Sequence, residues 1–362
     1  MEKLAIAARG IALELDLSIG HIADLVIEAE GRRLRPLHRA PWIDEAATAV
    51  ADWSPGTKGL SGDFLCAPFS ASDVEPAPLH GWPANSPWDV IENAAMPGGW
   101  RARLRLRRTV MGATLEKVLI LRDGHPFLYQ EHAFIGGEGE LSAAHHPMTA
   151  MRAGGRIAFS PKRLAMTPDA SLEPDPTRGR YALAYPGRTE DLSRFPRADG
   201  GSYDLTAYPA DGREEDFVIL VEAPHDGPGW TAVAREAEKD LFLVLKNPAE
   251  LPVTMLWLSN GGRDYAPWNG RHSGVLGVED GRTAVGHAAS LGDNELKRMG
   301  VPTAFRLSPG GAVRFRHVLG ALPLPAAAAP ADILAADGRI TARLADGTSV
   351  SGAFDDKFLA SE

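Results

Sequence analysis

Short stretches in which apolar and polar residues alternate recur along the whole chain. Residues 11–19 (IALELDLSI) alternate in this way, and 22–29 follow after the Gly20-His21 break. A period of two is typical of strands, and Gly, Pro, Asn and Asp between such runs favour turns. The same criteria predict strands at 103–110, 115–121, 127–134, 155–160, 217–222, 240–246, 253–258, 274–279, 303–307 and 312–319. Repeated strands with short turns indicate a mainly β, antiparallel sandwich or barrel, not alternating βαβ units.

Helical periodicity is weak, so we expect few and short helices. The best candidates are Ala232–Asp240 (AVAREAEKD), which predicts two turns before a strand, and Asn294–Met299 (NELKRM). Long Pro- and Gly-rich connections at 67–88, 161–180 and 185–213 separate the predicted strands. Because long loops on a rigid scaffold often carry binding groups, we expect functional residues there.

The C-terminal end of the chain has a different pattern. Residues 322–332 (LPLPAAAAPAD) are typical of a linker, and Asp346-Gly347 between GRITARL and TSVSGAF predicts a hairpin. We therefore expect a main β domain at 1–325, and a linker and accessory hairpin at 326–362. The hairpin would pack on the main body or on a neighbouring subunit.

Composition and charge narrow the possible partners. The 362 residues are 44% hydrophobic and 23% charged, so the chain can form a sizeable core without metals or disulfides. The net charge of −9 argues against nucleic acid or an anionic membrane as the main partner. The densest basic stretch, Arg101–Arg108 (RARLRLRR), alternates with apolar residues and predicts a strand with a solvated basic face; a phosphate-attracting rim is the alternative.

The location expected from the sequence is the cytoplasm. Cys66 is the single cysteine and cannot form an internal disulfide, so no oxidising compartment is required. The N-terminus lacks the pattern of a secretory signal, and no window approaches the ~20 apolar residues of a membrane span.

Reactive side chains are concentrated in three segments rich in turn residues. Ser61–Trp88 contains Gly62-Asp63, Cys66-Ala67-Pro68-Phe69 and Leu79-His80-Gly81-Trp82-Pro83. The second segment is His145-His146-Pro147, and the third is Gly274–Arg282, which includes Glu279 and Asp280. In an extended segment neighbouring residues point to opposite faces, so only one of each adjacent pair can enter a given pocket.

These motifs and their order resemble those of the aldose 1-epimerase (galactose mutarotase-like) superfamily. A Gly-rich segment, Cys/Ala-Pro-Phe, His-Gly with an aromatic residue, His-Pro and a late Glu follow one another over roughly residues 10–320. About 66 residues separate His80 from His146, and about 133 more lead to Glu279. The resemblance implies a large antiparallel β-supersandwich whose site lies on one concave face.

The resemblance also implies roles for individual residues. Glu279 matches the general base that takes the proton of the anomeric hydroxyl, and His146 matches the general acid that protonates the ring oxygen. His80 matches the second histidine, which holds the sugar. Such chemistry needs no cofactor and no metal, because a carboxylate and an imidazole can exchange the protons near neutral pH. The partner would be a small-molecule sugar, bound by a monomer or homodimer.

Other residues are predicted to contact this sugar. They are acidic or hydrogen-bonding groups and flat aromatic rings near the motifs, several of them in the Gly-rich segment Ser259–Arg271: Asp63, Trp82, His145, Trp257, Arg263, Asp264, Trp268 and Asn269. Many members of the family have an arginine where Ser61-Gly62-Asp63 stands. An acidic group there would repel a sugar phosphate, which favours a free, neutral sugar.

Three alternatives remain open at this level. The protein can be a non-catalytic carbohydrate-binding protein on the same scaffold, or a glycosidase or lyase, although adjacent Glu279 and Asp280 are a poor carboxylate pair. His125, Glu131 and His132, with the two later histidines, can also be interpreted as a metal cluster. Their spacing lacks a helical His-Glu-x-x-His or paired-cysteine pattern, so we expect no metal site.

Overall fold

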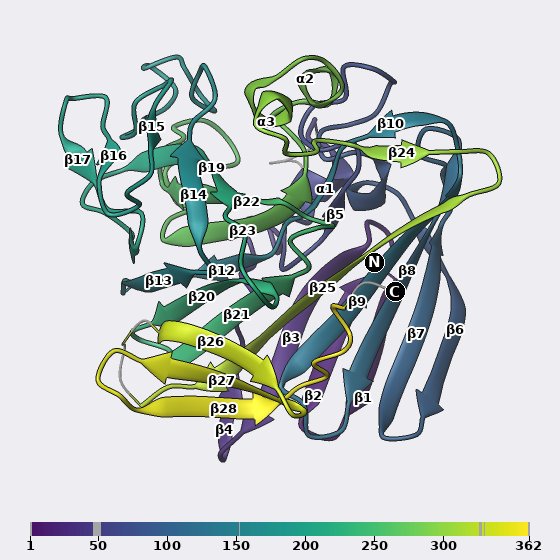
Figure 1. Ribbon diagram of the computed structural model, residues 1–362. Helices are drawn as coiled ribbons and strands as arrows, with labels where there is room; N and C mark the ends of the chain where they lie inside the picture. The colour runs from purple at the N-terminus through teal and green to yellow at the C-terminus, as the bar shows by residue number, and fades with distance from the viewer. Residues whose placement is uncertain (1, 46–51, 152, 326–327, 329, 361–362) are drawn as a thin grey trace.

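The computed structural model describes residues 2–45, 52–151, 153–325, 328 and 330–360. Within these ranges, two large antiparallel sheets face each other across a shared core (Figure 1). Sheet A contains, in spatial order, β15 (Arg188–Thr189), β14 (Lys162–Met166), β19 (Glu214–Glu222), β22 (Val253–Asn260), β23 (Val275–Arg282), β11 (Ala143–His145) and β5 (Leu65–Cys66), and β12 (Met148–Ala150) also pairs with β23. Sheet B contains β18 (Ala207–Tyr208), β13 (Gly155–Phe159), β20 (Gly229–Arg235), β21 (Asp240–Lys246), β25 (Ala312–Pro323), β9 (Phe127–Gly136), β8 (Ala113–Arg122), β7 (Gly99–Leu106) and β6 (Trp88–Met96). The predicted large antiparallel sandwich is confirmed.

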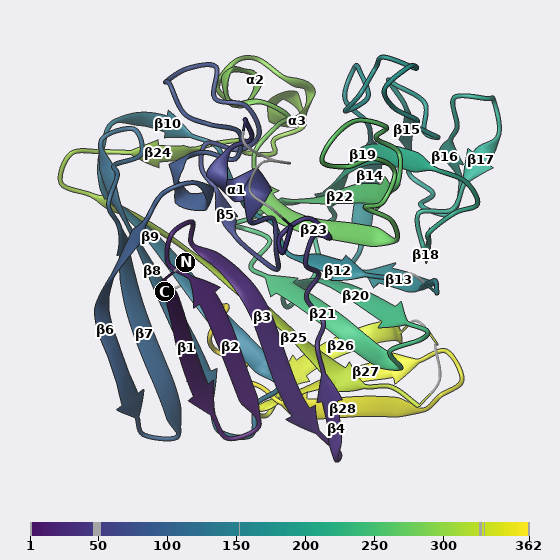
Figure 2. The same cartoon turned by 180° about the vertical axis from the view of Figure 1, so that it is seen from behind.

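The N-terminal sheet covers one end of sheet B (Figure 2). It consists of β1 (Lys3–Ala8), β2 (Ile11–Asp16), β3 (His21–Ala29) and β4 (Arg32–Leu34). Leu13 and Leu25 from this sheet join the same buried cluster as Leu104 and Leu119 of sheet B. The pattern of alternation in 11–29 therefore places its apolar face in the shared core, as expected for strands with one buried side.

Alternation also divides the strands at the centre of sheet B between two layers. On β21, Phe242 and Val244 belong to the core shared with sheet A, whereas Leu241, Leu243 and Leu245 belong to a cluster on the opposite face. Both faces of this strand are thus buried, and its sequence is continuously apolar for that reason.

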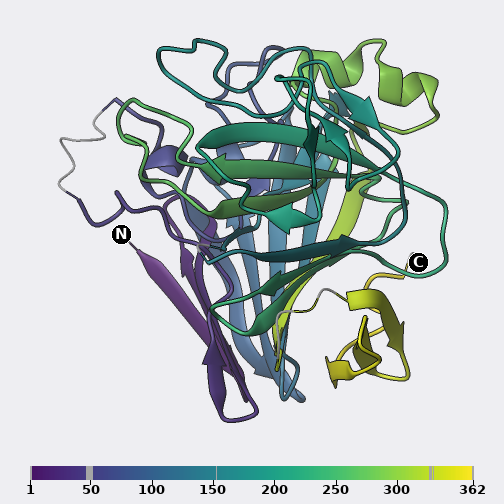
Figure 3. The ribbon, with the colours of Figure 1, turned by 90° about the vertical axis from the view of Figure 1, so that its left-hand side faces the viewer.

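The chain's C-terminal part forms the tail sheet, which packs on that opposite face of sheet B (Figure 3). It consists of β26 (Pro330–Ala336), β27 (Arg339–Leu344) and β28 (Ser349–Ala353), and the β27–β28 pairing confirms the predicted hairpin. The Phe354 ring lies 5.3 Å from that of Phe127 and 5.8 Å from that of Tyr129, between ring centroids. The hairpin therefore contacts the main body of its own chain.

The predicted helix at Ala232–Asp240 is wrong, whereas the one at Asn294–Met299 is confirmed. Residues 229–235 form β20, paired with β13 and β21, and the chain then turns into β21 at Asp240. Ala232, Val233 and Ala234 are fully buried in the sheet, so tertiary packing overrides a helix-favouring composition. The helices among the described residues are α1 (Pro55–Lys58), α2 (His287–Leu291), α3 (Glu295–Arg298) and a short 3₁₀-helix, Trp82–Ala84.

The remaining predictions of strands are also confirmed, because each predicted range overlaps an observed strand. Small pairs add β10 (Gly139–Leu141) with β24 (Phe305–Leu307), and β16 (Phe195–Pro196) with β17 (Ser202–Tyr203). In the described part of the chain, no helix is long and apolar enough to cross a membrane.

The basic stretch in β7 has the predicted solvated face. Arg101 pairs with Glu92 and Arg105 with Glu116, each with an N–O distance of 2.8 Å, while Leu104 is buried. Neighbouring carboxylates therefore compensate these two arginines, as expected for a solvated strand face.

Candidate active site

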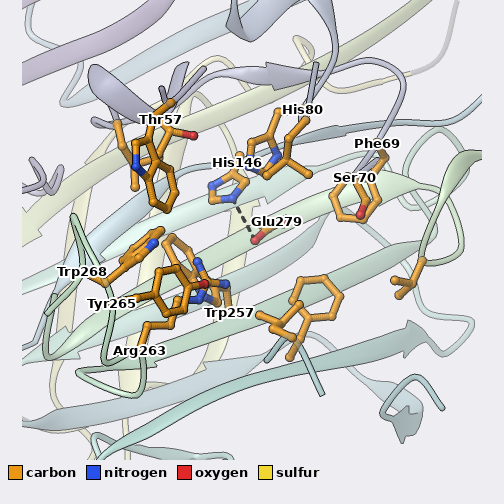
Figure 4. A pocket seen from close by; sticks show the side chains of 16 residues that line it. Thr57, Phe69, Ser70, His80, His146, Trp257, Arg263, Tyr265, Trp268 and Glu279 are labelled. Atoms are coloured by element: carbon orange, nitrogen blue, oxygen red, sulfur yellow. Dashed lines mark ion pairs between the residues drawn. The ribbon is translucent and has the colours of Figure 1, made fainter. Parts of the chain in front are cut away.

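A cavity of about 290 Å³ lies on the outer face of sheet A (Figure 4). Phe217, Trp257 and Glu279 reach it from strands β19, β22 and β23, and His146 reaches it from the segment between β11 and β12. The other lining residues come from loops, α1 and its surroundings: Trp53, Thr57, Leu60, Phe69, Ser70, Leu79, His80, Leu172, Arg263, Tyr265, Trp268 and Val285. A rigid sheet thus forms the floor, and loops form the walls.

Two adjacent pairs of residues are divided between the cavity and the interior. His146 and Glu279 line the cavity. Their neighbours His145 and Asp280 are buried between the sheets and both contact His317 of β25, His145 by ring stacking at 4.0 Å and Asp280 at 3.1 Å from Nε2. The expectation that only one member of each pair enters the pocket is confirmed.

His146 and Glu279 form the centre of the site. Nε2 of His146 lies 3.2 Å from Oε1 of Glu279, and both side chains are almost completely buried. The imidazole of His146 stacks on Phe64, with 4.5 Å between centroids, and its backbone N–H donates to Phe64 O and Asp63 Oδ1. These contacts fix the ring beside the carboxyl group.

His80 completes the set from a distant loop. Its ring centroid lies 5.3 Å from that of His146, in an edge-to-face arrangement. Nδ1 of His80 lies 3.4 Å from Sγ of Cys66, which is fully buried. The next residue must be glycine, because Gly81 has a φ of 73° and a Cβ there would lie 2.0 Å from the carbonyl oxygen of Ala67.

Burial sets the protonation of this group. It raises the pKa of Glu279 well above its ordinary range. Burial, together with the nearby His80, lowers the pKa of His146 well below its ordinary range, and burial with the charge of Arg263 lowers the pKa of His80 to about 4. Near neutral pH the pair therefore holds one proton, as a carboxylic acid facing a neutral imidazole.

One wall of the cavity is aromatic and carries a compensated positive charge. The Arg263 guanidinium lies over the Trp268 ring, 4.4 Å from its centroid, and Nη2 is 3.3 Å from Oε1 of Glu215. The same buried carboxylate accepts a 2.6 Å hydrogen bond from Nε1 of Trp257. Glu215 thereby fixes both side chains and neutralises the arginine.

Six of the eleven residues predicted for the site line this cavity, namely His80, His146, Glu279, Trp257, Arg263 and Trp268. The other five lie elsewhere. Asp63 and His145 are buried between the sheets. Trp82 packs under the Arg108 guanidinium, 4.1 Å from its ring centroid. Asp264 pairs with Arg180 and Arg213, and Asn269 is exposed on the same loop. The argument that Asp63 would repel a sugar phosphate therefore fails, because its carboxylate does not face the cavity.

Asp63, His145 and His317 form a buried group whose ligating atoms lie within 4.8 Å of one another. Such a donor set suits a divalent ion. However, Asp63 already accepts a 2.6 Å hydrogen bond from Gln130, and burial lowers the pKa of Lys117 to about 8 against the opposing effect of the Asp63 carboxylate. A metal ion would add charge beside this lysine, and Asp63 instead holds the backbone of His146.

Sequence reasoning missed most of the apolar walls and the carboxylate behind them. Trp53, Leu172 and Phe217 come from segments far apart in the chain, and nothing in their local pattern marks them. Phe69 stands in the Cys66-Ala67-Pro68-Phe69 motif but was not assigned to the site. Glu215 belongs to the acidic run Glu214-Glu215-Asp216, which is buried at the start of β19. The sequence signal that could have identified Glu215 is the run of three acidic residues at the start of an apolar strand.

Comparisons with known proteins find likeness in structure but not in sequence. No protein-family model matches the chain, and no curated protein matches it. Among solved structures, a candidate aldose 1-epimerase from Escherichia coli K12 is similar, with 13% identity, a TM-score of 0.56, and coverage of 88% of this chain and 98% of that one. A galactose mutarotase related enzyme from Lactobacillus acidophilus covers 90% of this chain and 99% of its own, with 10% identity and a TM-score of 0.52.

A third structure supports the same conclusion. A galactose mutarotase-like protein from Lactobacillus casei has 11% identity and a TM-score of 0.51, over 88% of this chain and 100% of that one. At such identities the likeness concerns the fold. The chain has the galactose mutarotase-like fold that its ordered motifs predicted.

Proposed function

We propose that this protein is an isomerase of the aldose 1-epimerase type, which interconverts the anomers of a free, uncharged sugar. The observation that carries the proposal is the convergence of His80, His146 and Glu279 in one buried, aromatic-walled cavity. Three segments separated by long stretches of sequence bring a carboxyl group and two imidazoles together there. This combination provides a proton acceptor and a proton donor for ring opening.

In the proposed reaction, a bound sugar stabilises the ionised form of the His146–Glu279 pair. The anomeric hydroxyl donates to Glu279 and the ring oxygen accepts from His146, so the proton shared by the pair moves across their 3.2 Å contact to His146. Glu279 then removes the hydroxyl proton while His146 protonates the ring oxygen, and the bond between C1 and the ring oxygen breaks. Rotation about C1–C2 and the reverse transfers close the ring on the other face.

His80 supplies a hydrogen bond in this scheme. Burial raises the pKa of the Cys66 thiol well above its ordinary range, so the thiol stays protonated and donates to Nδ1 of His80. Nε2 then carries the ring's hydrogen and becomes a donor. We propose that this N–H holds the anomeric oxygen as its charge develops.

The charges at the cavity support an uncharged substrate. Glu215 compensates Arg263, and Glu279 and the two histidines carry no net charge near neutral pH. An anionic sugar would therefore meet no free positive charge among the lining residues that the structure describes.

The lone Cys66, which requires no oxidising compartment, supports a cytoplasmic location. We also propose that the protein is a monomer or homodimer.

Exchange NMR tests the proposal directly. One anomer's C1 proton is saturated, and transfer to the other anomer is followed for a panel of unphosphorylated hexoses and pentoses. An isomerase should accelerate the transfer for at least one sugar, and the variant His146→Gln should remove about 10²–10⁴-fold of the rate. Sugar binding without acceleration would overturn the proposal and favour the alternative, a non-catalytic carbohydrate-binding protein.

A further inference from the structure

The polar and apolar residues that line the cavity are unevenly distributed around Glu279. Figure 4 shows Phe69 and Ser70 on one side of Glu279 and Trp268 and Tyr265 on the other. Five aliphatic or phenyl side chains line the cavity besides its tryptophans and Leu60, namely Phe69, Leu79, Leu172, Phe217 and Val285. The Phe69 and Phe217 rings pack together there, with 6.3 Å between centroids.

Several polar groups elsewhere in the lining already have partners within the protein, whereas Nε1 of Trp268 and Nε of Arg263 are buried without one. Oγ1 of Thr57 lies 3.0 Å from Oγ of Ser54, and Nη2 of Arg263 contacts Glu215. Nε1 of Trp257 donates to the same carboxylate. His80, His146 and Glu279 are assigned to the anomeric centre, so the unpartnered donors left for the other hydroxyls belong to Trp268 and Arg263, on the side of Glu279 away from Phe69 (Figure 4). A hydroxyl that loses water without gaining a partner weakens binding.

The rim of the cavity is apolar as well. Leu79 is 48% exposed and Leu172 is 38% exposed, and both line the cavity at its mouth. Large aliphatic side chains left in water beside a concave site are typical of surfaces that contact an apolar part of a ligand. The exposed leucines and the buried Phe69–Phe217 pair therefore line the same cavity as Glu279.

Resting on the proposed function, we infer that the substrate is a reducing sugar in which an apolar group replaces a hydroxyl, as in a 6-deoxyhexose. The anomeric carbon and ring oxygen lie at Glu279 and His146. The methyl group that replaces the exocyclic hydroxymethyl lies against Phe69, Phe217 and the rim leucines. A methyl group is stabilised there by burial, whereas a hydroxymethyl group would lose its hydrogen bonds to water.

Matched pairs of sugars test this inference. L-fucose is compared with L-galactose, L-rhamnose with L-mannose, and 6-deoxy-D-glucose with D-glucose, by the exchange NMR measurement at equal concentrations. We expect kcat/KM to be about tenfold or more higher for the deoxy member of the accepted pair. Equal rates, or a preference for the hydroxymethyl member, would overturn the inference while leaving the isomerase function intact. If no sugar in any pair is accelerated, the proposed function itself fails.

Variants of the two exposed leucines test whether the apolar lining causes the preference for a deoxy sugar over its parent sugar. Leu172→Asn and Leu79→Asn place a hydrogen-bonding group at the mouth, and both positions are exposed enough to tolerate it. Each should lower the deoxy-to-parent ratio of kcat/KM several-fold. Leu334→Asn is the matched control, because Leu334 is 49% exposed on the distant tail sheet. A ratio unchanged in both rim variants would contradict the assignment of this surface.

Discussion

Nε2 of His146 lies 3.2 Å from Oε1 of Glu279, although each residue's neighbour in sequence points to the opposite side of sheet A. On the inner side, Asp280 accepts a 2.6 Å hydrogen bond from the Thr254 hydroxyl. Its Oδ1 also forms an ion pair with Nζ of Lys246, at 2.9 Å. Each of the two segments thus gives one residue to the cavity and one to a buried ionic network. The network fixes the backbone from which the His146–Glu279 pair projects.

The buried carboxyl group of Glu279 should make the free energy of unfolding decrease as pH rises. Burial raises its folded pKa, so its stabilising effect is complete below the unfolded value and is lost as pH increases through the folded one. We expect Glu279→Gln to be more stable than wild type by about 1–3 kcal/mol at alkaline pH, with a smaller difference near about pH 5. Urea unfolding at several pH values measures this. Glu190→Gln, an exposed site, is the control, and an equal difference at all pH values would contradict the expectation.

The buried histidines should make the fold sensitive to acid. Burial is the main cause that lowers the pKa of His21 to about 3 and those of His80 and His145 to about 4. These groups stabilise the folded state above the unfolded pKa of about 6.5, and this stability is lost as pH falls towards the folded values. At pH values between the folded and the unfolded pKa, each histidine should lower the free energy of unfolding by about 1.4 kcal/mol for every unit of pH decrease. Unfolding free energies measured from about pH 7 to pH 4.5 test this, and a flat profile would refute it.

Cys66 should act on the reaction through His80. The thiol lies 3.4 Å from Nδ1 and sets which ring nitrogen carries the hydrogen. Cys66→Ala should lower kcat several-fold with little change in KM, whereas Cys66→Ser, which keeps a donor, should retain most activity. A ¹⁵N NMR spectrum of the histidine rings would show the change of tautomer directly. Equal kcat values for the alanine and serine variants would contradict a positioning role.

Glu215 should determine the charge preference of the cavity. Glu215→Gln keeps the contact with Trp257 but leaves Arg263 without its compensating carboxylate. We expect binding of a sugar acid such as D-galacturonate to improve about fivefold or more relative to D-galactose, measured by calorimetry or NMR titration. Asp264→Asn is the matched control, because Asp264 pairs with Arg180 and Arg213 outside the cavity. No change in the acid-to-neutral ratio would show that Arg263 does not face the ligand.

The strands could be predicted from the sequence because their signal is local. Alternation in 11–29 and at His145-His146 specifies which side chains share a face, and the structure confirms both. Ala232–Asp240 could not be predicted in this way, since its alanines and charges favour a helix locally. One of its partners, β21, follows directly in the chain, but the other, β13, lies far earlier in the sequence, and packing between the two favours the strand.

The composition of the candidate site was only partly accessible. His80, His146 and Glu279 stand in motifs with turn residues, which mark them in the sequence. Asp63 has equally polar surroundings but is buried against Gln130 and the His146 amide, and local pattern does not distinguish these fates. The importance of Glu215 depends on Trp257 and Arg263, which lie 42 and 48 residues further along the chain and meet it only after folding.

The most direct test of the proposed chemistry compares anomer exchange in wild type and Glu279→Gln, with sugar binding measured in parallel. Glutamine fills the same space and still donates or accepts hydrogen bonds, but it cannot take up the hydroxyl proton. We expect wild type to accelerate exchange of an unphosphorylated sugar and the variant to lose about 10²–10⁴-fold of that rate while its Kd changes little. Equal exchange rates in the two proteins would contradict the assignment of Glu279 as the base at the centre of this site.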